Sequence, residues 1–160
     1  MISMLSPNFN NRPDNTVIDS IIVHYTGMKT AQEALDRLCD PASKVSAHYT
    51  IDEDGTVYNH VSPLKRAWHA GVSSFAGRSG FNDFSVGVEL VNPGHEYGYR
   101  AFPDVQINAL VMLMSDLYDQ FPIEPQWVLG HSDIAPLRKQ DPGELFPWDI
   151  LVAKGLAIRP

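Results

Sequence analysis

The chain has 160 residues, of which 44% are hydrophobic, and it carries a formal net charge of −7 and one cysteine. This length suits one domain that buries a core without disulfides, and the lone Cys39 excludes disulfide frameworks and sites built from several thiolates. The negative charge disfavours a nucleic-acid partner, which requires a surplus of Lys and Arg to neutralise phosphates. We therefore expect a single domain over residues 1–160, in which any metal is held by His and carboxylate side chains.

The apolar stretches are short, and those at 21–23 and 109–114 fall far below the roughly 20 residues of a membrane-spanning helix. Residues 1–13 contain no basic segment followed by an apolar one, so no secretory signal is visible. The sequence predicts a cytoplasmic monomer without a membrane span. Removal of a leader from the chain would instead place it in the periplasm or at the envelope.

The first half of the chain predicts a strand, a helix and a hairpin. Residues 17–25 form an apolar, β-branched run that delivers a histidine at its carboxyl end, where open α/β sheets place their sites. Thr30, followed by Glu33, makes a capping box for a helix over 31–38. Two further strands, at 47–52 and 56–61, flank a short glycine-containing loop.

The second half adds two strands and two helices. Residues 86–91 and 127–130 are expected as strands, and apolar residues recur at helical spacing over 104–121. Residues 133–143 are expected as a loop, and 148–154 as a final helix with Gly155 past its end. The fold class is therefore α/β, with a central mixed sheet flanked by helices.

Six histidines are the candidates for chemistry, because the chain has no pair of thiolates. A catalytic zinc needs three protein ligands and one open position, but spacing alone does not choose among His24, His48, His60, His69, His95 and His131. The H-E-x-x-H, G-x-S-x-G and phosphate-binding glycine motifs are absent from the sequence.

Five motifs nevertheless occur in a recognisable order. They are VHYTG at 23–27, SAHY at 46–49, AWHAG at 67–71, GVEL at 87–90 and GHSDIAPLRKQDPG at 130–143. With these motifs the chain resembles the type 2 N-acetylmuramoyl-L-alanine amidases, a family related to phage T7 lysozyme and peptidoglycan recognition proteins. The resemblance runs from about Ser6 to Trp148, and the fourteen-residue motif is highly specific. It implies a mixed sheet packed by helices, with zinc in a surface groove.

The resemblance implies that one zinc ion is held by His24, His131 and Asp141. His24 closes a buried strand and His131 follows another, and such rigid supports hold ligands well. Asp133 is the rival third ligand, since it lies two residues from His131. We expect Asp133 to bond backbone N–H groups in a turn instead, whereas Pro142 biases Asp141 to an extended conformation. His60 and His95 match no motif and are interpreted as structural or surface residues.

Two further residues receive catalytic roles from the resemblance. Glu89 sits in an apolar strand, where desolvation raises the pKa of a carboxyl towards the range of a general base; the alternative is a Glu paired with a buried Lys or Arg. Lys139 projects to the same side as Asp141 if the segment is extended, and the family places it beside the scissile carbonyl, where an ammonium stabilises the oxyanion.

The implied reaction is zinc-assisted hydrolysis of the amide between L-alanine and N-acetylmuramic acid or its 1,6-anhydro form. The implied partners are peptidoglycan fragments or muropeptides. Candidates to line the groove are Tyr25, Lys44, His48, Trp68, His69 and Arg78, with aromatic rings against sugar or peptide and basic groups against stem-peptide carboxylates. For Trp68, a place in the core is an equal alternative.

Two departures from the family pattern concern specificity. Leu137 replaces a small or polar residue, and the short connection between His24 and His48, with the ending LFPW at 145–148, resembles relatives of broader specificity. A strict demand for the anhydro sugar is therefore in doubt. Two other functions remain open at this point: a zinc peptidase that cuts within the stem peptide, and a non-catalytic peptidoglycan-binding receptor.

Overall fold

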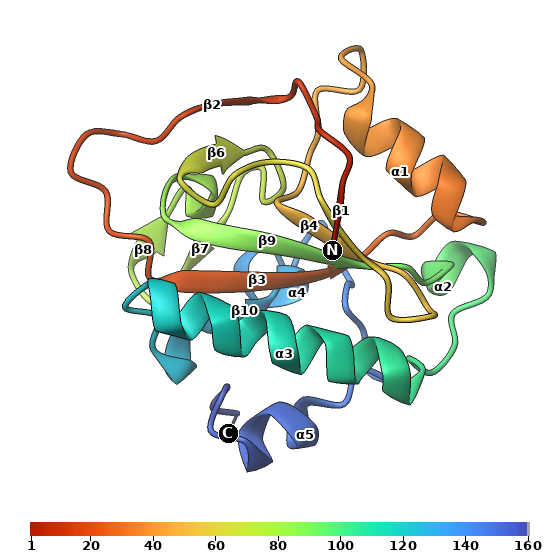
Figure 1. The fold of residues 1–160 in the computed structure, drawn as a ribbon. Coiled ribbons are helices and arrows are strands. Elements are labelled where there is room, and N and C mark those ends of the chain that lie inside the picture. Colours follow the sequence, from red (N-terminus) through yellow and green to blue (C-terminus); the bar gives the residue numbers. More distant parts are fainter. Residues whose placement is uncertain (160) are drawn as a thin grey trace.

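A six-stranded mixed sheet forms the centre of the computed structural model, which describes residues 1–159 (Figure 1). The strands lie in the order β1-β5-β4-β9-β3-β10, and every neighbouring pair is parallel except β4 with β5. They comprise β1 (Ile2–Ser3), β3 (Ser20–Tyr25), β4 (Tyr49–Ile51), β5 (Val57–Asn59), β9 (Ser85–Leu90) and β10 (Val128–Gly130). The predicted fold class is confirmed.

The first elements follow the sequence closely. Strand β3 begins at Ser20 rather than Val17, whose side chain is exposed. Helix α1 (Ala31–Cys39) is capped by Thr30, whose hydroxyl accepts a 3.2 Å hydrogen bond from the Glu33 N–H. The predicted hairpin is the antiparallel pair β4 and β5.

Several short elements were not predicted, because they lack the length that makes a periodic pattern visible. They are the two-residue strand β1, β2 (Phe9–Asn11) paired with β6 (Lys65–Ala67), β7 (Ser74–Phe75) paired with β8 (Arg78–Ser79), α2 (Gly94–Tyr97) and the 3-10 turns η1 (Phe81–Asp83) and η2 (Pro125–Trp127). The prediction of a loop over 133–143 was wrong for its first two residues. Residues His131–Ile134 form the short helix α4, in which the Asp133 carboxylate accepts a bond from the Gly130 N–H.

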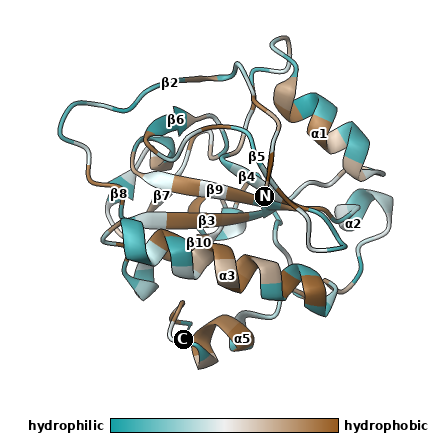
Figure 2. Ribbon diagram, in the orientation of Figure 1, coloured by the Kyte–Doolittle hydropathy of each residue, from teal (hydrophilic) through white to brown (hydrophobic). Residues whose placement is uncertain are grey.

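Helices α3 (Asp104–Gln120) and α5 (Trp148–Ala153) cover one face of the sheet, and Figure 2 shows apolar residues along β3, β9 and α3. The main core joins alternate residues of the central strands to α3, since successive strand residues point to opposite faces. From β3 and β9 it takes Ile21, Val23, Val86, Val88 and Leu90; from α3 it takes Ile107, Leu110, Met114 and Leu117.

The same alternation sends the polar residues to the opposite face. His24 and Glu89 are register partners at the carboxyl ends of β3 and β9, which are parallel. They are not in the α3 core, and a smaller apolar cluster lies on their side of the sheet: Ile22, Ala70, Phe81, Leu129 and Ile134. The fold therefore brings two of the predicted site residues together by strand register.

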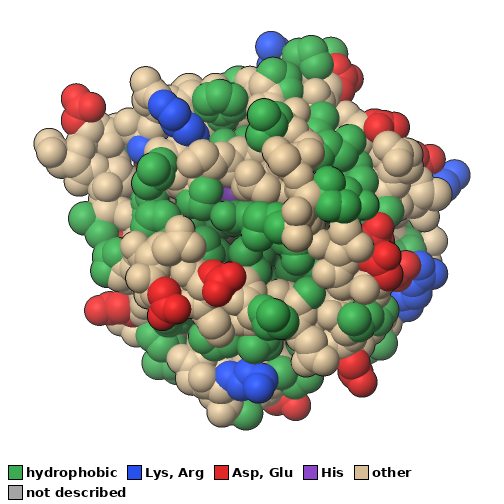
Figure 3. Space-filling model, viewed as in Figure 1, with side chains coloured by type: hydrophobic (Ala, Val, Ile, Leu, Met, Phe, Trp, Pro, Cys, Tyr) green, Lys and Arg blue, Asp and Glu red, His purple; other side chains and the backbone are tan. Residues whose placement is uncertain are grey.

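Two surface features bear on the expected partners. No helix within residues 1–159 combines the length and the apolar character needed to cross a membrane. On the face drawn in Figure 3, Lys and Arg side chains lie apart from one another instead of gathering in a basic patch.

Candidate metal centre and cavity

Three side chains from distant parts of the chain meet at one point. The Nδ1 atoms of His24 and His131 lie 2.9 Å apart, and Oδ2 of Asp141 lies 3.1 Å from each of them. All three residues are buried, and they form a group that can hold a metal ion. We call these residues the ligand triad.

The geometry of the triad fits zinc. A tetrahedral zinc with ligands at 2.0–2.1 Å separates its ligand atoms by roughly 3.3 Å, close to the separations within the triad. Burial lowers the pKa of His24 to about 4, so its ring is neutral at neutral pH. Burial alone would raise the pKa of Asp141, but the adjacent His131 and His24 imidazoles lower that pKa below the ordinary value. Three acceptors thus face one point.

Rigid elements support each member of the triad. His24 lies in β3, and His131 opens α4 directly after β10. The Ser132 N–H donates to the Asp141 carbonyl over 2.9 Å, which ties the segment carrying Asp141 to α4. A Cβ at Gly130 would lie 2.7 Å from Cδ of Pro142, so the glycine allows this segment to pack against β10.

Asp133, the rival ligand, lies outside the triad. Its Oδ2 accepts a 2.7 Å bond from the Gly130 N–H and lies 2.8 Å from Nη1 of Arg159. The expectation that Asp133 bonds a backbone N–H is confirmed.

Glu89 lies in the strand beside His24 and has no partner for one oxygen. Its Oε2 is buried, and it makes no hydrogen bond or ion pair with any residue of the described chain. Burial raises the pKa of Glu89 well above its ordinary value, the charge of Asp141 raises it further, and Lys139 opposes the shift. The direction of this shift is the one expected for a carboxyl in an apolar strand, and pairing with a buried Lys or Arg is absent within residues 1–159.

A cavity of about 420 Å³ opens over the triad. Glu89 and Lys139 both line it, and so do Arg37 from α1 and Arg138. Lys139 is exposed and takes part in no ion pair among residues 1–159, whereas Arg138 donates to the carbonyls of Ala70 and Val72. Lys139 therefore presents a free ammonium to the space over the triad.

Three of the six candidate groove residues line this cavity: Tyr25, Trp68 and His69. Trp68 is half-buried and lines the cavity, and its Nε1–H donates to Oδ1 of Asn10 over 3.1 Å. His69 is buried, and both of its ring nitrogens bond to protein atoms.

The other three candidates lie away from the cavity wall. His48 is fully buried; its Nδ1 accepts from the Gly87 N–H and its Nε2 donates to the Lys65 carbonyl. Arg78 bonds both carboxylate oxygens of Asp19 and lies over aromatic rings. Lys44 is exposed, with a left-handed φ of 56°, next to cavity residue Val45.

His60 has a structural role. It is buried, and its two ring nitrogens bond the Met4 carbonyl and the Thr50 hydroxyl. His95 has a more specific place than the sequence indicated. It bonds the Tyr25 hydroxyl over 2.9 Å and the Glu144 carboxylate over 2.9 Å, and so links the residue after His24 to the segment after Asp141. Neither partner lies near His95 in the sequence, which is why the pattern did not reveal it.

The chain is similar to several N-acetylmuramoyl-L-alanine amidases. The family model described as N-acetylmuramoyl-L-alanine amidase matches residues 13–144. The chain is 36% identical over 169 residues to the 1,6-anhydro-N-acetylmuramyl-L-alanine amidase AmpD of Escherichia coli K12, covering 93% of this chain and 90% of AmpD. It is also 36% identical over 155 residues to N-acetylmuramoyl-L-alanine amidase AmiD of the same organism, covering 89% of this chain but only 55% of AmiD.

A solved structure of the E. coli AmiD protein superposes with a TM-score of 0.81 at 33% identity, covering 94% of this chain and 63% of that one. That structure is a complex with anhydro-N-acetylmuramic acid-L-Ala-D-gamma-Glu-L-Lys. This chain therefore spans most of AmpD but little more than half of AmiD.

Proposed function

Because the chain belongs to the N-acetylmuramoyl-L-alanine amidase family, we propose that it hydrolyses the muramoyl–L-alanine amide with one zinc ion held by His24, His131 and Asp141. The observation that carries the proposal is the triangle of acceptor atoms with edges of 2.9, 3.1 and 3.1 Å at the cavity. Zinc bound there would polarise the amide carbonyl and make water more acidic.

Glu89 acts as the general base in this proposal. Its carboxylate lies on the strand next to His24, faces the cavity and keeps a buried oxygen without a protein partner. A carboxylate with a raised pKa accepts a proton readily from water that attacks the carbonyl and then passes it to the leaving nitrogen. Pairing with an internal cation would have removed this capacity.

Lys139 stabilises the negative charge that develops on the carbonyl oxygen. Its ammonium lines the cavity two residues before Asp141 and has no carboxylate partner among residues 1–159. A preorganised cation is worth most where charge appears only in the transition state. Tyr25 and Trp68 would form the aromatic wall against sugar or peptide.

The substrate class follows from the relatives. AmiD was solved with an anhydro-muramoyl tripeptide, and AmpD is named for the anhydro sugar. We propose that this chain takes muropeptides of N-acetylmuramic acid or its 1,6-anhydro form.

Mass spectrometry of a digested muropeptide tests the proposal directly. We expect a muramoyl sugar and a complete stem peptide that begins with L-alanine, about one zinc per chain, and loss of turnover on chelation. Parallel digestion of matched substrates with and without the anhydro ring measures the preference between the sugars. A shortened stem would instead show a peptidase, an intact substrate would show a receptor, and full turnover in metal-free protein would remove zinc from the mechanism.

A further inference from the structure

A chain of hydrogen bonds leaves the ligand triad through the second ring nitrogen of His24. Nε2 of His24 lies 3.0 Å from Nδ1 of His69, and Nε2 of His69 lies 3.2 Å from the Ser85 hydroxyl oxygen. The Ser85 hydroxyl in turn donates to the carbonyl of Phe81. All four residues are buried, which limits competition from water for these bonds.

The carbonyl at the end of this chain sets the direction of every bond in it. A carbonyl only accepts, so the one hydroxyl proton of Ser85 points to Phe81, and the hydroxyl oxygen accepts from Nε2–H of His69. A neutral imidazole carries one N–H, so Nδ1 of His69 accepts from Nε2–H of His24. The Nδ1 atom of His24 is then left without a proton, as a zinc ligand must be.

We propose that His69, oriented by Ser85, is the positioning residue that holds His24 in the tautomer that binds zinc. The inference rests on the proposed role of His24 as a ligand. It replaces the expectation that His69 contacts substrate, because both ring nitrogens of His69 are already engaged.

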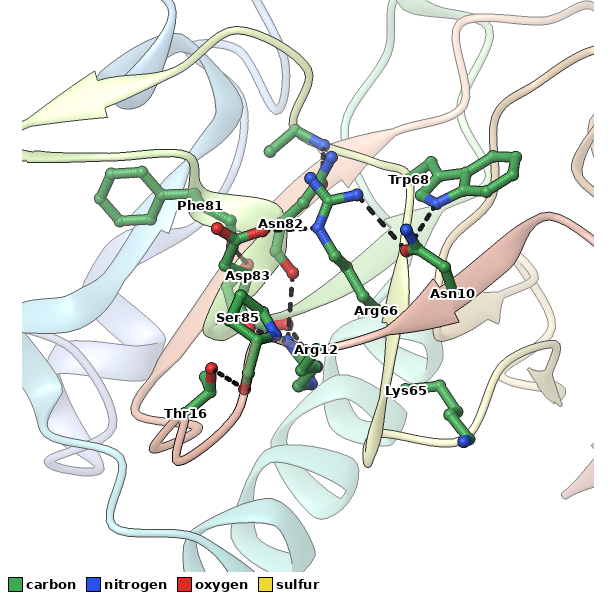
Figure 4. Close-up of polar contacts among 12 residues, drawn as sticks. Asn10, Arg12, Thr16, Lys65, Arg66, Trp68, Phe81, Asn82, Asp83 and Ser85 are labelled. Carbon is green, nitrogen blue, oxygen red and sulfur yellow. Dashed lines mark hydrogen bonds and ion pairs between the residues drawn. The ribbon is translucent and has the colours of Figure 1, made fainter.

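The surrounding structure is built to hold this ring. The N–H groups of His69 and Ala70 both donate to Oδ1 of Asn82, over 3.0 and 2.7 Å. A Cβ at Gly87 would lie 2.4 Å from Cγ of His69, so only glycine leaves space for the ring against β9. Arg12 fixes the segment that carries Asn82 and Ser85, since it donates to the carbonyls of both (Figure 4).

The tautomer of His131 is set by a backbone carbonyl instead of a side chain. Its Nε2 lies 3.1 Å from the carbonyl of Ala70, which can only accept, so the backbone sets its tautomer. The two-residue segment His69 and Ala70 thus orients both ligand histidines. Of the two histidines, only His24 is oriented by a side chain, that of His69, so its orientation can be tested by substitution.

Two substitutions separate a positioning role from a structural one. In His69→Asn the side-chain oxygen takes the place of Nδ1 and still accepts from His24, whereas in His69→Gln the polar group takes the place of Nε2 and reaches only Ser85. We expect the zinc affinity, measured by competition with a chromophoric chelator, to fall about 10- to 100-fold in His69→Ala and His69→Gln and to be largely kept in His69→Asn.

Urea unfolding of the metal-free variants supplies the control. A structural role would make zinc affinity follow stability, with no advantage for His69→Asn over His69→Gln, and that result would overturn the inference. The inference would also be overturned if the unsubstituted protein binds zinc and His69→Ala binds it with the same affinity. A parent that binds no zinc would overturn the proposed function as well. In zinc-loaded protein, ¹⁵N spectra should show His24 and His69 protonated on Nε2; a proton on Nδ1 of His69 would contradict the proposal.

Discussion

Two polar clusters lie near His69, one around the half-buried Arg12 and one at the buried ligand triad, and they differ in how their donors and acceptors match. The first is the arginine cluster, in which Arg12 donates to the carbonyls of Pro63, Asn82, Asp83 and Ser85 over 2.8–3.1 Å. Figure 4 shows Arg12 beside Asn82, Asp83 and Ser85. The second is the ligand triad, where three acceptor atoms face one another. In the arginine cluster each carbonyl acceptor has an N–H donor. In the triad the three acceptors have no donor between them, and a cation would satisfy all three.

The difference shows what marks a site inside a protein. Both clusters gather polar groups that are at least partly buried, so neither clustering nor burial identifies chemistry by itself. A buried group with a matching partner stabilises the fold, whereas a surplus of acceptors calls for a ligand. Glu89 belongs with the triad by this criterion, because its Oε2 lacks a donor within residues 1–159.

The largest effect is expected from substitution of Asp141 in the ligand triad. We expect Asp141→Ala to lose zinc and turnover, because two histidines remain where zinc needs three protein ligands. Asp133→Ala is the matched control. It should keep zinc and lose about 1 kcal/mol of stability, since Asp133 caps α4. Metal analysis and urea unfolding of both variants decide the matter, and the reverse pattern of zinc contents would assign the ligand to Asp133.

Substitution of Glu89 separates the base from the ligands. Glu89→Gln keeps the shape of the side chain but removes the proton acceptor, so turnover should fall about 10²- to 10⁴-fold while the zinc content stays unchanged. Steady-state kinetics and metal analysis on the same preparation measure both. Loss of zinc in this variant would make Glu89 a ligand and contradict its role as the general base.

Substitution in the arginine cluster should act on stability instead. Arg12→Met leaves the carbonyls of Pro63, Asn82, Asp83 and Ser85 without their donor, and we expect the free energy of unfolding to fall by about 1–3 kcal/mol. The folded variant should still bind about one zinc. A variant with parental stability that fails to bind zinc would show that the cluster is part of the site.

A further effect concerns the pH dependence of stability. Burial lowers the pKa of His48 from 6.5 to about 3, so His48 favours the folded state above the unfolded pKa and loses this contribution as pH falls towards 3. In metal-free His48→Gln, unfolding free energies at neutral pH and near pH 4 should differ less than in the parent, by up to about 1.4 kcal/mol per pH unit. Equal slopes in the two proteins would refute this assignment.

The sequence predicted the long elements well, because their patterns are local. The capping pair Thr30 and Glu33, the alternation along β9 and the helical spacing over 104–121 each reflect neighbours in the chain. The short helix α4 was missed, since four residues carry no periodic signal.

The histidines and carboxylates that could form a metal site can be read from the sequence, and the family resemblance selects His24, His131 and Asp141 among them. The folded structure was needed to show that Nδ1 of His24 and of His131 faces Asp141, and that Arg78 and His48 bond other residues. These arrangements depend on hydrogen bonds between residues that are distant in the chain. The tautomer of His24 depends on partners 45 and 61 residues away, His69 and Ser85, and no local pattern records which nitrogen each of them will meet.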